Sequence, residues 1–83
     1  MQAADAVEVI VSVMAPYIGD TMARSAARAH CLKLGVGETL SAAQASALLD
    51  RLGSGLNIFL GRDKSAAVLA ETRRALERVG NAP

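Results

Sequence analysis

The chain has 83 residues, enough for one domain and too few for two, so we expect a single domain over residues 1–83. Of its residues 52% are hydrophobic, but many of these are alanine and only Tyr17 and Phe59 are aromatic, so we expect a shallow core that a second copy or a partner completes. A net charge of +1 excludes the strong positive field typical of proteins that bind nucleic acid or anionic membranes.

The first segment, residues 5–14, carries two patterns. Valine occupies every second position from Val7 to Val13, as in a strand. Asp5, Glu8 and Ser12 instead follow the spacing of one helical stripe. The sequence holds no second strand to pair with this segment. We therefore predict a helix, with an intermolecular strand as the alternative.

The second helix is predicted to begin at Pro16, because proline favours the first helical position. Gly19 would then lie in its first turns, or the helix would begin at Asp20. Gly35 is placed to end this helix in a left-handed conformation.

The third helix is predicted over Ala42–Leu52, because Ser41 and Gln44 have the spacing of a capping box. Its inward residues are Ala45, Leu48, Leu49 and Leu52. The sequence GSG at 53–55 is expected to end it. A short apolar helix or turn follows, anchored by Leu56, Phe59 and Leu60 and closed by Gly61.

The last helix is predicted over about Lys64–Val79, capped by Asp63 and ended by Gly80. Arg73 and Glu77 should pair on its exposed side. We expect residues 81–83 to fray. The predicted buried stripe consists of Val68, Leu69, Thr72, Leu76 and Val79. The fold class is all-α: a compact bundle of four or five short helices.

Projection at about 100° per residue gives the second helix two apolar faces. We expect one face to pack on the later helices: Ile18, Met22, Ser25, Ala26, Ala29 and Leu32. The other holds Ala23, Ala27, His30 and Leu34, and must meet the first segment or another chain. Arg24, Arg28 and Lys33 form a basic flank, which is either solvated or faces an acidic partner.

His30 and Cys31 are the only histidine and cysteine. Adjacent helical residues do not face each other, which argues against a catalytic dyad, and two ligands are too few for zinc. We interpret His30 as a helix-contact residue and Cys31 as a small buried one, and expect no cofactor or metal. The sequence AHCLKLG is also similar to the A-H-x-L-K-G pattern of histidine phosphotransfer domains, with Gly35 one residue late. That resemblance makes His30 a candidate phosphoacceptor supported by Lys33.

The stretch LLDRLGSGLNIFL has the outline of a helix-turn-helix, which gives a further alternative, a small DNA-binding regulator. Only Asn57 could read bases there, so nucleic acid is not the expected partner. Carboxylates lie on separate elements, which argues against paired acid–base catalysis.

Residues 14–60 resemble a short helical domain found at the C-terminal ends of some bacterial signalling proteins, including serine/threonine kinases. The resemblance is carried by Met14, Tyr17, Ile18, Gly19, Phe59 and Leu60, with Asp20 where those segments usually have proline. It implies a signalling adaptor.

We therefore predict a non-enzymatic interaction module that forms a homodimer and binds a further protein. The absence of a basic leader, of a long apolar run and of paired cysteines predicts a cytoplasmic protein. The candidate interface residues are Tyr17, Ala23, Arg24, Ala27, Arg28, His30 and Leu34.

Overall fold

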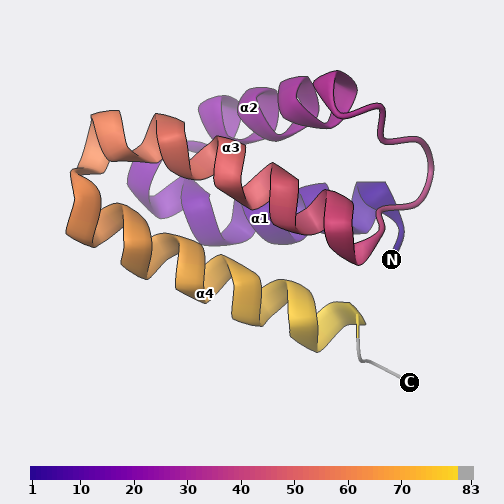
Figure 1. The fold of residues 1–83 in the computed structure, drawn as a ribbon. Coiled ribbons are helices and arrows are strands. Elements are labelled where there is room, and N and C mark those ends of the chain that lie inside the picture. Colours follow the sequence, from indigo (N-terminus) through magenta and orange to yellow (C-terminus); the bar gives the residue numbers. More distant parts are fainter. Residues whose placement is uncertain (81–83) are drawn as a thin grey trace.

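The computed structural model describes residues 1–80, and within them the chain forms a four-helix bundle, which confirms the all-α class. The helices are α1 (Ala3–Ile18), α2 (Asp20–Lys33), α3 (Ala42–Leu60) and α4 (Arg62–Gly80). The predicted frayed tail at 81–83 lies outside the described residues. In Figure 1, α3 lies in front, with α2 above it, α4 below it and α1 behind. Helix α1 packs on α2 and α4, and α3 packs on α4 and, over a shorter length, on α2.

Residues 5–14 are helical, as predicted, because one side of α1 supplies the centre of the core. Its buried residues are Ala6, Val7, Ile10, Val11 and Met14. The chain just before α1 also pairs with the loop before α3. Gln2 and Thr39 form an isolated antiparallel bridge, and the Leu40 amide donates to the Met1 carbonyl at 2.8 Å. Within residues 1–80, the chain forms this isolated bridge and no β-strand.

The predicted start of the second helix at Pro16 is wrong. Pro16 lies inside α1, which continues to Ile18, and α2 begins at Asp20, the alternative start. A proline so near the end of a helix removes one hydrogen bond without stopping the remaining turn. The break occurs at Gly19, whose φ of 88° and ψ of 151° cannot continue a helix.

The prediction for the end of α2 is confirmed. Gly35 has a φ of 70°. Its amide donates to the Leu32 carbonyl at 3.1 Å, and the Val36 amide donates to the Cys31 carbonyl at 3.0 Å. These two bonds are those of a Schellman motif, which satisfies carbonyls at the helix end.

The predicted roles of the two apolar faces of α2 are only partly correct. The face with Ala23 and Ala27 meets α1, where both residues are fully buried. Because these side chains are small, the two helices approach closely. The other face packs less on α3 than expected, so that four of its residues are exposed: Met22, Ser25, Ala29 and Leu32.

The start of α3 has the predicted capping box. The Gln44 amide donates to Ser41 Oγ at 3.1 Å, and the Ser41 amide donates to Gln44 Oε1 at 3.0 Å. Two donors at the helix start are therefore satisfied by the pair.

Replacing Ser41 by alanine is expected to lower the free energy of unfolding by about 1 kcal/mol, because it leaves the Gln44 amide without its acceptor. Chemical denaturation followed by circular dichroism measures the change. Ser46→Ala is the matched control, since Ser46 is exposed within the same helix. Equal stability of the two variants would contradict a role for the box.

The prediction that GSG ends the third helix is wrong, because α3 continues through it to Leu60. Gly53 is buried against α4, and a Cβ at this position would lie 2.6 Å from Leu69 Cδ1. The glycine thus permits a close helix contact, whose burial outweighs its low helix propensity. The helix-turn-helix outline is lost for the same reason, since residues 48–60 form one helix. Of the expected anchors, Leu56 is buried, Leu60 is partly buried and Phe59 is exposed.

Helix α4 begins at Arg62, so Asp63 lies in its first turn and is not the cap that we predicted. An acidic residue in the first turn is still stabilised by the positive end of the helix dipole. Val68, Thr72 and Leu76 are buried as predicted, whereas Leu69 is partly buried and Val79 is exposed. The expected Arg73–Glu77 pair is not among the ion pairs that form within residues 1–80.

None of the helices in the described part of the chain combines the length and the apolarity needed to cross a bilayer.

Candidate functional site

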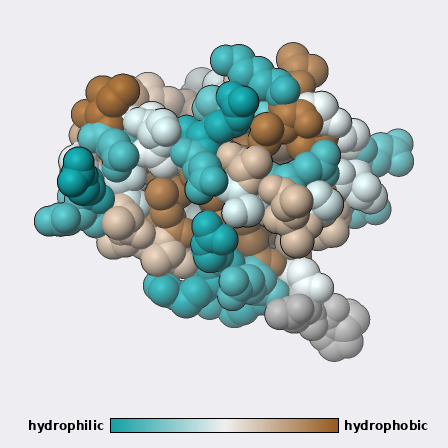
Figure 2. Space-filling view, in the orientation of Figure 1, coloured by the Kyte–Doolittle hydropathy of each residue, from teal (hydrophilic) through white to brown (hydrophobic). Residues whose placement is uncertain are grey.

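Large hydrophobic side chains are exposed at the end of the bundle where α1 passes into α2 and α3 passes into α4. Tyr17 is 41% exposed, Met22 43%, Ile58 86% and Phe59 63%. Figure 2 shows hydrophobic side chains at this end, on the left, beside polar ones. We call these four residues the apolar end. Exposed apolar side chains gathered at one end of a soluble protein are typical of interaction sites.

A groove runs from the apolar end along the seam between α2 and α3, and we call it the His30 groove. Its volume is about 80 Å³. Metabolite sites are commonly several times larger, about 300 Å³ and above, so this groove suits a protein side chain better than a small molecule. Its lining residues are Met14, Ile18, Met22, Ala26, His30, Leu52, Gly55, Leu56 and Phe59.

His30 supplies an unsatisfied polar atom in this groove. Its Nδ1 atom is buried and has no hydrogen-bond partner within the described chain. Buried polar atoms are nearly always paired, so this unpaired nitrogen is an unusual and energetically costly feature of the groove. Burial lowers the pKa of His30 below its usual value, and the charges of Lys33 and Arg51 lower it further. The imidazole is therefore neutral at neutral pH.

His30 and Cys31 lie in different hollows, as the helical projection predicted. Cys31 lines a second hollow of about 300 Å³ between α1 and α2, together with Arg28 and Leu32. Burial raises the pKa of the Cys31 thiol, so it is protonated at neutral pH. The two side chains do not form a dyad. In residues 1–80, no cluster of three or more histidine, cysteine, aspartate or glutamate side chains could hold a metal ion.

The basic flank of α2 is partly neutralised within the chain. The Arg24 guanidinium donates to the Glu8 carboxylate on α1 and lies 3.6 Å from Asp20 Oδ1. The hydrogen bond from Arg24 lowers the pKa of Glu8, and the same bond raises the pKa of Arg24. Arg24 therefore ties α2 to α1, and Arg28 and Lys33 are the exposed cations of the flank.

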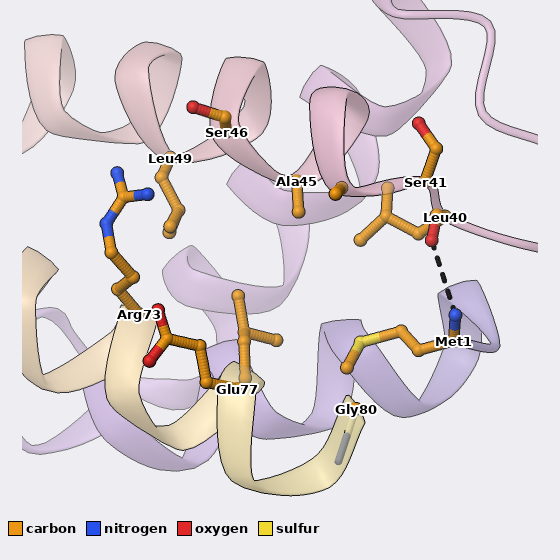
Figure 3. A pocket seen from close by; sticks show the side chains of 11 residues that line it. Met1, Leu40, Ser41, Ala45, Ser46, Leu49, Arg73, Glu77 and Gly80 are labelled. Atoms are coloured by element: carbon orange, nitrogen blue, oxygen red, sulfur yellow. Dashed lines mark hydrogen bonds between the residues drawn. The ribbon is translucent and has the colours of Figure 1, made fainter.

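A further groove, of about 310 Å³, lies between the first half of α3 and the last half of α4. Figure 3 shows Leu49 and Ala45 on one wall, Arg73 and Glu77 on the other, and Met1 at one end. The backbone nitrogen of Met1 donates to the Leu40 carbonyl there, at 3.3 Å. The groove exists because Ala42, Ala45 and Gly80 leave its space unfilled. This groove was not predicted from the sequence, although the small side chains of Ala42 and Ala45 at the start of α3 were a signal.

The predicted interface residues do not form one surface. Ala23 and Ala27 are fully buried within the chain, Arg24 is held in ion pairs, and Leu34 packs against the core. Arg28 lies at the α1–α2 hollow. Tyr17 is at the apolar end and His30 is in its groove. Met22 and Phe59 were predicted to lie in the interior, and Ile58 and Arg51 were not singled out. Ile58 lies off the stripe of Leu48, Leu52 and Leu56, which was a signal of its exposure. Phe59 lies on that stripe, so its spacing gave no such signal.

The resemblance of residues 14–60 to a helical domain of bacterial signalling proteins stays a prediction from the sequence. We compared the chain with protein-family models, with curated proteins and with solved structures. None of the three comparisons found a match.

Proposed function

We propose that this chain is a non-enzymatic protein-interaction module that self-associates through the apolar end and the His30 groove. The observation that carries the proposal is the exposure of Met22, Ile58 and Phe59 beside a groove that holds an unpaired polar atom. Covering these side chains removes apolar surface from water, at about 25 cal/mol per Å².

A second copy is the partner that fits this surface best. Phe59 is exposed and also forms part of the groove wall, so a projecting side chain, or knob, and a hollow lie side by side there, and Ile58 is exposed at the same end of the bundle. A two-fold axis through such a patch places the knob of each copy over the hollow of the other, as in isologous dimers. The resemblance of residues 14–60 to a helical domain of bacterial signalling proteins is what supports an adaptor role in signalling or regulation, in which a further protein is recruited to another face.

The two alternative functions gain less support. A phosphoacceptor histidine needs an accessible ring, whereas Nδ1 of His30 is buried and the rest of the ring is only partly exposed in an apolar groove. A DNA-binding regulator would need a recognition helix, and the residues that resembled one lie within the continuous α3.

Replacing Phe59 by serine is expected to weaken self-association by about tenfold or more, because a large apolar contact at the centre of the interface is lost. Sedimentation equilibrium over the micromolar range measures the dissociation constant. Val79→Ser is the matched control, since Val79 is 40% exposed on α4, away from the apolar end. A chain that is strictly monomeric at all concentrations, or equal effects of the two variants, would contradict the proposal.

A further inference from the structure

The unpaired Nδ1 of His30 lies in the groove through which we propose that the chain self-associates. The atom is already shielded from solvent by the chain itself, and the surrounding groove is almost entirely apolar. A neutral imidazole can remain there at a modest cost, because one uncharged nitrogen is left unpaired. A protonated imidazole would place a charge and a second N–H donor in the same apolar space, which is far less favourable.

The charges around His30 make protonation still less favourable. Lys33 follows His30 by about one turn on α2, and Arg51 belongs to α3. The positive charges of both side chains disfavour a positive charge on the imidazole. From α1 the groove receives Met14 and Ile18, neither of which is ionisable. Among the described residues that line the groove, no carboxylate is present to stabilise an imidazolium.

We propose that protonation of His30 dissociates the self-associated state, so that the His30 groove makes the assembly sensitive to pH between neutrality and about pH 5. This inference rests on the proposed self-association. It requires that the second copy cover the groove and so remove the remaining contact between the imidazole and water.

The sign of the effect follows from proton linkage. Association favours the neutral ring, so the associated state binds fewer protons than two separate chains, and acidification favours the separate chains. A two-fold dimer contains two copies of His30, so up to two protons are taken up when it dissociates. The stability of each folded chain changes in the same direction: the contribution of His30 is complete above its ordinary pKa of about 6.5 and is lost as pH falls through the lowered value.

Sedimentation equilibrium at pH 7.0 and pH 5.0 tests the inference, since histidine is the side chain whose ordinary pKa lies in that interval. The dissociation constant of the natural chain is expected to rise about tenfold or more on acidification. His30→Gln keeps a polar side chain that does not titrate, and its dissociation constant is expected to change by less than about twofold. Circular dichroism at both pH values confirms that the chains stay folded.

The single histidine also permits a direct measurement on the natural chain. Its imidazole proton resonances in NMR report the pKa of His30 without assignment. The midpoint is expected to be lower at high protein concentration, where chains associate, than at low concentration. This measurement decides the question even if His30→Gln fails to fold.

The outcomes separate the two proposals. Self-association with the same dissociation constant at both pH values, and a histidine midpoint that does not depend on concentration, would overturn the pH inference and leave the proposed function standing. A chain that is monomeric at pH 7.0 at all concentrations would overturn the proposed self-association itself.

Discussion

Replacing Gly19 or Gly61 by alanine is expected to lower the free energy of unfolding by about 1–3 kcal/mol each, and the double variant by about the sum. Each glycine is the single residue between two helices. Gly19 has φ 88° and ψ 151°, and Gly61 has φ 82° and ψ 163°. This combination is open essentially to glycine alone, because a Cβ collides with the adjacent backbone. Both sharp turns of the bundle therefore depend on the same backbone conformation.

The backbone strain expected from alanine at positions 19 and 61 can be separated from the effects of side-chain packing. At both positions no atom beyond the two neighbouring residues lies within 4 Å of where a Cβ would be, so alanine would collide only with the adjacent backbone. Gly37 is also unobstructed but has no positive φ, so Gly37→Ala is the matched control and is expected to be neutral or slightly stabilising. Denaturant titrations at low micromolar concentration give the free energies. Equal stabilities of all the variants would contradict the strained turns.

The helices themselves were predictable from local patterns, because capping and periodicity are local. Ser41 and Gln44 marked the start of α3, and Gly35 marked the end of α2. The roles of the other glycines were not predictable, since they depend on what lies opposite them. Gly53 resembles a helix terminator in the sequence, yet it is the contact point for Leu69, which is 16 residues further along the chain.

The candidate site was predictable only in part. Helical projection separated His30 from Cys31, and the structure places them in different hollows. Projection could not show how much of α2 is covered by α3, because that depends on the packing of α2 on α1 through Ala23 and Ala27. Met22 was therefore assigned to the interior and is exposed. Arg51 comes near His30 through the tertiary fold, which no spacing within α2 indicates.

Replacing Gly53 by valine is expected to lower the free energy of unfolding by about 3 kcal/mol, because overpacked buried positions force neighbouring elements apart. The first added atom would already lie 2.6 Å from Leu69 Cδ1. A single methyl group can be accommodated by rotation of the partly buried Leu69 side chain. Gly53→Ala should therefore be close to neutral, since alanine gains about 1 kcal/mol of helix propensity. The two further methyl groups of valine exceed that freedom and displace α4.

Gly55 gives the matched control on the same helix. It is exposed, and apart from the nearby backbone of its own helix no atom lies within 4 Å of where a Cβ would be. At concentrations where the chain is monomeric, Gly55→Val is therefore expected to change stability by less than about 0.5 kcal/mol. Combining Gly53→Val with Leu69→Ala tests the cause directly. If the Leu69 side chain is the obstruction, the double variant is more stable than the sum of the single effects predicts, by about 1 kcal/mol or more. Strict additivity would contradict this contact as the reason for a glycine at position 53, and would assign the cost to the spacing of the α3 and α4 backbones.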